Sequence, residues 1–328
     1  MIERSPFGSR RSWRETIARA ILVFDVPLLL VLMALASIGL MSMYSAGGGF
    51  DGRFADQLRN YGIALAAMWL LAQFSPHALM RLAVPIYVLG VVLLIAVEVA
   101  GITSKGATRW LELGVTRIQP SEMMKIAVPL MLAWYFHRHQ GWLRVRDFVV
   151  AGLLMGVPFA LIVLQPDLGT ALLVFGAGFF VLFFAGLSFK LLIPVTVVVT
   201  LALGSLVTFE HDLCEGDLDW VILHDYQKHR VCTLLNPGSD PLGKGFHTIQ
   251  STIAVGSGGT LGKGWMQGTQ THLDFIPERT TDFIFAVFAE EFGLVGNVVL
   301  LVLYLLLLIR GLTIAANAPT LFSRLLGG

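Results

Sequence analysis

Long apolar runs separated by short polar stretches extend along most of the chain. A helix needs roughly 20 apolar residues to cross a bilayer, and it pairs its own backbone polar groups while doing so. The pattern predicts an all-α, polytopic helical membrane protein with eight transmembrane helices, of which the second and fourth are short and need flanking residues. The expected spans are residues 23–45, 61–74, 80–99, 122–136, 148–164, 169–187, 191–209 and 283–309.

The composition agrees with this fold class. Of 328 residues, 55% are hydrophobic and 14% are charged, whereas soluble proteins carry roughly 25% charged residues. The formal net charge of +1 gives no reason to expect a nucleic-acid partner. No repeat or low-complexity linker divides the chain. We therefore expect a cytoplasmic basic segment at residues 1–20 and one transmembrane domain at residues 21–328, which includes a long extracytoplasmic loop at residues 210–282.

The basic residues predict the orientation of the chain. Loops on the cytoplasmic side carry an excess of Lys and Arg, and the segment before the first span is rich in arginine. With the N-terminus in the cytoplasm, alternation of the spans also places Arg81, Lys190 and Arg310 inside. The same alternation places the 210–282 loop outside.

The two cysteines, Cys214 and Cys232, both fall in this outer loop. An oxidising compartment permits a disulfide there. The sequence does not supply the geometry that a disulfide needs, so a disulfide and two separate thiols both stay open.

Three polar clusters border the apolar runs, at residues 109–122, 165–169 and 277–282. The predicted topology puts all three on the outer face of the membrane. Charged groups are costly at the edge of lipid, so three clusters on one side predict a single shared polar site.

Asp282 is the main candidate for a catalytic residue, at the start of the last apolar run. An aspartate at that place is also favoured as a helix cap. A cap does not explain why Glu278 and Arg279 lie just before it, or why two other polar clusters share the same face. We therefore favour a functional role for Asp282, with Glu278 and Arg279 as substrate-binding candidates; a cap is compatible with it.

Three further side chains are candidates for substrate binding. Glu122 and Lys125 are three residues apart, so they share one face of a helix. A cation for phosphate with a neighbouring carboxylate and a structural ion pair are both open for this pair. Arg109 suits phosphate because its planar donors can bind two oxygens, although an interfacial anchor beside Trp110 is the alternative.

The glycine-rich stretch at residues 256–264 does not fit a nucleotide-binding loop, because Gly264 follows Lys263 where Ser or Thr is required. A tight backbone turn near a polar head group fits better, and Lys263 is kept as a substrate-binding candidate. In the last span, partnered structural carboxylates are favoured for Glu290 and Glu291.

Two remaining features favour structure over function. Asp167 is expected to cap the sixth helix. His272 and Asp274 supply two ligand types, which is too few to predict a metal site.

Six blocks of the sequence together resemble the SEDS (shape, elongation, division and sporulation) family over about residues 23–307, and more closely its cell-elongation members. The resemblance implies a peptidoglycan glycosyltransferase that polymerises lipid II and releases undecaprenyl pyrophosphate. It implies a bacterial inner-membrane location, about ten spans, and partnership with a class B penicillin-binding protein and other elongation-complex proteins. It also implies that the acidic residue at Asp282 is essential. The blocks are residues 106–111, 119–125, 165–170, 240–245, 250–259 and 273–286.

The chemistry of that reaction assigns roles to the candidates. Asp282 would be the general base for the acceptor hydroxyl, and Arg109, Lys125 and Arg279 would bind the pyrophosphate. Direct displacement would invert the anomeric centre. A divalent cation, Mg²⁺ or Mn²⁺, stays open, and no other cofactor is expected. The alternatives are a lipid II flippase and a non-catalytic scaffold that recruits a transpeptidase. Family members continue through two more spans, so the chain is expected to be a truncated form.

Overall fold

The computed structural model describes residues 24–50, 52–104, 107–112, 117–141, 143–209, 214, 225–239, 244–273 and 278–328. The chain divides into two compact units. In the described residues, the first unit comprises residues 24–75, 257–273 and 278–310, and the second comprises residues 76–256 and 311–328.

Each expected span is a helix, so the prediction of a polytopic helical membrane protein is confirmed. By length and apolar composition, α2, α4, α6 and α13 are each able to cross a membrane. The short second span extends into its flanking residues, because α3 begins at Gly52 rather than at residue 61. The helices are α2 (Val26–Ala46), α3 (Gly52–Ala72), α4 (Pro76–Ala100), α5 (Pro120–Arg138), α6 (Val145–Leu164), α7 (Leu168–Phe184), α8 (Phe189–Thr208) and α13 (Ile284–Ala316).

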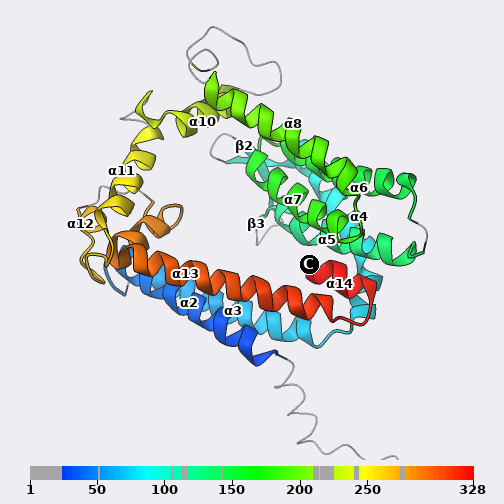
Figure 1. Cartoon of the computed structure of the whole chain (residues 1–328), viewed down its shortest axis with the longest axis horizontal. Helices are drawn as coiled ribbons and strands as arrows, with labels where there is room; N and C mark the ends of the chain where they lie inside the picture. The colour runs from blue at the N-terminus through cyan, green and yellow to red at the C-terminus, as the bar shows by residue number, and fades with distance from the viewer. Residues whose placement is uncertain are drawn as a thin grey trace, which may run out of the picture. The chain divides into compact units, whose positions relative to one another are not determined.

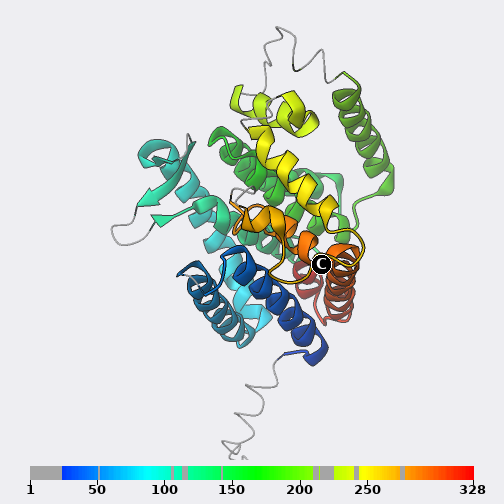
Figure 2. The same cartoon turned by 90° about the vertical axis from the view of Figure 1, so that its left-hand side faces the viewer.

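The connections contain elements that the apolar pattern did not predict. Three short antiparallel strands, β1 (Ile102–Ser104), β2 (Ala107–Glu112) and β3 (Arg117–Ile118), pair in the order β1-β2-β3 between α4 and α5 (Figure 2). Strands of two to six residues are too short to leave a clear alternation of apolar and polar positions. The remaining elements are α10 (Asp225–Leu235), η1 (Pro237–Ser239), α11 (Lys244–Ser257), α12 (Thr269–His272) and α14 (Leu321–Gly327).

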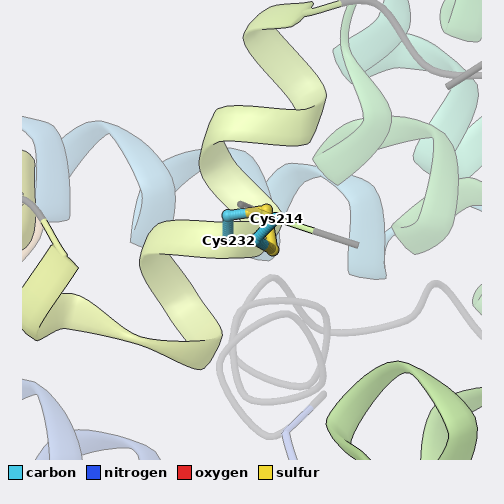
Figure 3. The surroundings of a disulfide bond; sticks show 2 residues. All are labelled: Cys214 and Cys232. Carbon is cyan, nitrogen blue, oxygen red and sulfur yellow. A yellow bond between two sulfur atoms is a disulfide. The ribbon is translucent and has the colours of Figure 1, made fainter. Parts of the chain in front are cut away.

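Cys214 and Cys232 form a disulfide, which decides the alternative left open by the sequence (Figure 3). Their Cα atoms lie 5.7 Å apart, and Cys232 belongs to α10. The bond ties α10 to a residue 18 positions earlier in the chain.

In the second unit, α5 forms the centre of the apolar core. Met124, Val128, Leu132 and Phe136 are fully buried at intervals of four residues, so they form one face of the helix. Helices α4, α6, α7 and α14 pack against α5. This packing fixes the N-terminal end of α5, where Gln119, Glu122 and Lys125 lie.

In the first unit, α2 and α13 run antiparallel and are joined at both ends (Figure 1). At one end, the Arg310 guanidinium donates to both carboxylate oxygens of Asp25, at 2.9 and 2.6 Å. At the other end, the Ser45 hydroxyl donates to the Glu291 carboxylate. Asp25 also caps α2 by accepting the Leu28 N–H at 3.1 Å.

The contacts of Asp25 with Arg310 and with the Leu28 N–H affect its titration. The Arg310 guanidinium, followed by the Leu28 N–H, holds the pKa of the Asp25 carboxyl below its ordinary value. A carboxylate with a lowered pKa stabilises the folded state above its ordinary pKa. That contribution is lost as the pH falls through the lowered value.

Helix α13 is interrupted at Gly293, whose φ of 62° and ψ of −159° are not helical. The carbonyls of the preceding turn and the N–H groups of the following turn would otherwise lack partners. The glycine loop (residues 257–264) supplies both. The Lys263 and Gly264 N–H groups donate to the carbonyls of residues 290 and 291, each at 3.0 Å. The Gly259 and Thr260 carbonyls accept from the N–H groups of residues 294 and 295, at 2.9 and 3.1 Å.

Glycine is required where this loop meets the broken helix. A Cβ on Gly293 would lie 2.3 Å from the backbone nitrogen of Gly262, and a Cβ on Gly262 would lie 2.1 Å from the carbonyl oxygen of Glu291. The expectation of a tight backbone turn in this stretch is confirmed, with positive φ at Gly259, Gly262 and Gly264.

We expect Gly293→Ala to destabilise the folded protein, because alanine is strained at this backbone conformation and collides with the loop. The strain alone is of order 1–3 kcal/mol. Gly311→Ala, in the same helix with no atom within 4 Å of its added Cβ, is the matched control. It should leave stability unchanged or raise it by up to about 1 kcal/mol. Thermal unfolding in detergent measures both, and equal unfolding temperatures for the two variants would contradict a rigid break at Gly293.

Candidate functional site

In the second unit, Arg109 holds the turn between α6 and α7. Its Nη2 donates to the Pro166 carbonyl at 2.5 Å and its Nε donates to the Gln165 carbonyl at 3.4 Å. Its Nη1 lies 3.8 Å from the Asp167 carboxylate. Arg109 is carried by β2, so the small sheet brings the first polar cluster against the second.

Asp167 is shared between a helix cap and this contact. Its side chain accepts the Thr170 N–H at 3.3 Å, which confirms the predicted cap of α7. The Gln119 side chain, just before α5, donates to Asp167 at 3.1 Å. The side chains of Arg109, Gln119 and Asp167 therefore meet at one point where β2, α5 and α7 converge.

Glu122 and Lys125 form an ion pair of 2.7 Å along one face of α5. The side chains are 53% and 33% exposed, respectively. Because the two residues belong to the same helix, their pair does not lock two helices together. The accessible ammonium group of Lys125 keeps the ability to bind an anion.

In the first unit, Asp282 lies in the 278–283 turn just before α13. The Thr281 and Phe283 N–H groups both donate to the Glu278 carbonyl, at 3.0 and 3.4 Å, so the turn is compact. Glu278 has a φ of 50°. Asp282 is exposed, and its carboxylate accepts no hydrogen bond from the described residues. Since α13 begins at Ile284, we find no capping contact for Asp282 in this part of the chain.

Two arginines fix the 278–283 turn. Arg279 Nε donates at 2.6 Å to the carbonyl of Ala46, the last residue of α2. A cation at this place suits the negative end of a helix. Arg53, in the first turn of α3, donates from Nη1 to the Thr280 hydroxyl at 2.8 Å. Thr280 itself is buried, so the turn presents Asp282 outward while Thr280 faces inward.

Glu290 lies farther along α13 and is fully buried, with an exposed fraction of 0%. Its Oε1 accepts from Lys263 Nζ at 2.6 Å, from the Gln270 N–H at 3.0 Å and from the Thr269 hydroxyl at 3.2 Å. Its Oε2 accepts from the Thr271 hydroxyl and N–H, at 3.2 and 3.4 Å. Glu291 accepts from Ser45. These contacts agree with the expectation of partnered structural carboxylates. The ammonium group of Lys263 is the cation paired with Glu290.

The structure thus groups the sequence-predicted residues in two places. Arg109 lies with the 165–169 cluster, and Glu122 and Lys125 follow Gln119 along α5, all within the second unit. Glu278, Arg279, Asp282 and Lys263 belong to the first unit. The gathering of all three clusters into one pocket stays a prediction. Of the two residues considered as metal ligands, His272 and Asp274, the second lies outside the described residues.

The sequence did not predict two side-chain contacts of the first unit, that of Ser45 with Glu291 and that of Arg53 with Thr280. Arg53 carried a usable signal, because the predicted topology puts it in a short outer loop where the cytoplasmic bias of Lys and Arg is broken. Ser45 carried none, since a serine at the end of an apolar helix is common.

Comparison with known proteins adds a family relationship. A family model described as a cell cycle protein, FTSW_RODA_SPOVE, matches residues 19–328. The peptidoglycan glycosyltransferase MrdB of Escherichia coli (strain K12) is 46% identical over 304 residues, which cover 93% of this chain and 79% of MrdB. The peptidoglycan glycosyltransferase RodA of Treponema pallidum (strain Nichols) is 31% identical over 372 residues, which cover 94% of this chain and 86% of that protein.

Solved structures give the same relationship. A chain from a peptidoglycan synthase complex, described as coordinating polymerization and crosslinking, matches with a TM-score of 0.73 and 35% identity, over 93% of this chain and 82% of its own. The rod shape determining protein RodA of Thermus thermophilus matches with a TM-score of 0.61 and 29% identity, over 93% of this chain and 80% of its own.

We expect Lys263→Met to lower the free energy of unfolding by about 3–5 kcal/mol, because it leaves the buried Glu290 carboxylate without its cation. Adding Glu290→Gln to that variant should restore part of the loss by removing the buried charge. Lys190→Met, at the exposed start of α8, is the control and should be neutral. Chemical unfolding in detergent measures all three, and a Lys263→Met protein as stable as wild type would show that this ion pair does not hold the loop.

Proposed function

Because the chain belongs to the FtsW, RodA and SpoVE family of cell cycle proteins, we propose that it is a peptidoglycan glycosyltransferase that polymerises lipid II into glycan strands. Relatives named for this activity align with nearly the whole chain. The observation that carries the proposal within the structure is the exposed Asp282 carboxylate on a turn fixed by two arginines.

The reaction joins a sugar hydroxyl to the anomeric carbon of a second lipid-linked sugar. The hydroxyl oxygen forms the new bond to that carbon, and its proton passes to a base. The bond from the carbon to the pyrophosphate breaks, and its electron pair leaves with undecaprenyl pyrophosphate. The leaving group departs as a stabilised anion, so it needs cations rather than a general acid, while the incoming hydroxyl needs the base.

Asp282 is the general base in this proposal. A carboxylate with no hydrogen-bond donor among the described residues has its lone pairs available for a hydroxyl proton. The compact 278–283 turn and the contacts of Arg279 and Arg53 hold the backbone around it. General-base help of this kind is typically worth roughly 10²–10⁴-fold in rate.

Basic side chains supply the positive charge for the pyrophosphate. Arg279 lies three residues before Asp282. For Arg109 and Lys125, binding of the pyrophosphate stays a prediction from the sequence. Stabilisation of developing charge is often the largest catalytic term. Lys263 would support substrate binding indirectly, because its ion pair with Glu290 fixes the glycine loop.

A divalent cation, Mg²⁺ or Mn²⁺, stays a prediction. Among the described residues, no group of three or more His, Cys, Asp or Glu is placed to hold one. The steps above are written for the side chains alone.

The partner and the location follow from the same proposal. One related chain belongs to a complex that coordinates polymerization with crosslinking. A class B penicillin-binding protein, which crosslinks strands, is the corresponding partner here, together with other elongation-complex proteins. The chain would lie in the bacterial inner membrane with its N-terminus in the cytoplasm and Asp282 on the extracytoplasmic face.

We expect Asp282→Asn to reduce polymerisation of lipid II by about 10²–10⁴-fold, because an amide cannot accept the hydroxyl proton. Asp56→Asn is the control, since Asp56 pairs with Arg59 on the exposed surface of α3. Gel analysis of glycan strands made by the purified proteins measures the effect, and unfolding temperatures verify that both variants fold. Full polymerisation by Asp282→Asn would remove Asp282 from the chemistry. A wild-type chain that makes no strands would favour a flippase or a scaffold.

A further inference from the structure

We propose that Arg53 is a binding residue for the pyrophosphate of the lipid-linked donor, beside the turn that carries the Asp282 base. This inference rests on the proposed function. It assigns the leaving group to a residue in the first turn of α3, outside all three polar clusters of the sequence.

Arg53 is tied to the candidate catalytic segment by one contact across 227 positions of sequence. Its Nη1 donates to the Thr280 hydroxyl at 2.8 Å. Thr280 has an exposed fraction of 7%, whereas Arg53 is exposed. A buried hydroxyl therefore holds one corner of an accessible guanidinium group beside the 278–283 turn.

The rest of the guanidinium group is available for an anion. Arginine has five N–H donors in a planar fork, and only Nη1 has an acceptor in the part of the chain that the structure describes. Arg109, by comparison, donates from two nitrogens to carbonyls of the α6–α7 turn. A planar fork also matches the oxygens of a phosphate group.

The depth of Arg53 selects the pyrophosphate over other anionic parts of the substrate. Arg279 donates to the carbonyl of Ala46, which ends the apolar helix α2. The 278–283 turn, which Arg53 contacts through Thr280, therefore lies where a span ends. In a prenyl-linked donor, the pyrophosphate is fixed at that depth by its lipid chain. The peptide carboxylates of the same molecule extend away from the membrane.

Arg53 contacts the same turn that carries Asp282. Thr280 and Asp282 are two residues apart, so their Cα atoms are separated by at most about 7 Å. Asp282 would take the acceptor proton on one face of the sugar, and Arg53 would stabilise the electron pair that leaves with the pyrophosphate on the other.

The test uses the purified chain and inorganic pyrophosphate as the probe. Its binding is measured by calorimetry, which requires no turnover, and by inhibition of lipid II polymerisation. Arg53→Gln should weaken pyrophosphate binding by about 10- to 100-fold, the range for losing a hydrogen bond to a charged group. It should also lower kcat by roughly 10²–10³-fold. Arg53→Lys keeps the charge but not the fork, so it should fall between wild type and Arg53→Gln.

Two controls separate binding from a structural effect. Arg59→Gln removes a cation from the same helix that pairs with Asp56 on the exposed surface, and it should change neither quantity. Thr280→Val removes the hydroxyl that holds Arg53 and should weaken pyrophosphate binding less than Arg53→Gln does. Unfolding temperatures verify that each variant is folded.

The outcomes distinguish this inference from the proposed function. If Arg53→Gln lowers kcat while pyrophosphate binds as to wild type, Arg53 only positions the turn and the inference is wrong. Unchanged kcat and unchanged binding overturn it as well. If the wild-type chain polymerises nothing but binds pyrophosphate through Arg53, the anion site stands and the proposed reaction fails.

Discussion

The buried carboxylate of Glu290 is the interaction on which the first unit depends. A charge at an exposed fraction of 0% is tolerated only when it is paired and hydrogen-bonded. Here the partners are the Lys263 ammonium and the donors of residues 269–271. All of them follow or belong to the glycine loop, so satisfying the carboxylate also fixes the path of residues 257–271.

That path has a second consequence at the break in α13. Backbone groups freed by a break inside an apolar helix must find partners within the protein. The glycine loop offers N–H groups to one side of Gly293 and carbonyls to the other. The loop and the break in α13 therefore depend on each other. Without the loop, backbone groups on both sides of Gly293 would lack partners, and without the break those groups would not be available to bind the loop. The 278–283 turn directly precedes the short helical segment that ends at Gly293, so that segment positions it. Hydrogen bonds from Arg279 and Arg53 also hold the turn.

The sequence predicted the parts of this arrangement that depend on composition or on neighbours in the chain. Apolar runs located each span, because lipid imposes length and hydrophobicity directly. The Asp167 cap and the pairing of Glu122 with Lys125 are local, so spacing was sufficient. The break at Gly293 was not predicted, since a lone glycine in an apolar run also fits a continuous helix. The pairing of Glu290 with Lys263, and that of Arg53 with Thr280, cross 27 and 227 positions, and no local pattern carries such distances.

The distribution of charge in the first unit favours chemistry at one end over passage through the unit. Between Glu291 and Arg310, α13 contains no charged residue, and neither does α2 between Val26 and Ala46. At the far end, Arg310 and Asp25 close on each other through two hydrogen bonds. A pyrophosphate that crossed this unit would leave the cations near Asp282 behind. The next cation along α13 is Arg310, whose charge is already neutralised by Asp25. A reaction confined to the Asp282 end needs no such path. There both oxygens of the buried Glu290 carboxylate accept hydrogen bonds, while the exposed Asp282 carboxylate and the exposed Arg53 keep unused hydrogen-bonding capacity.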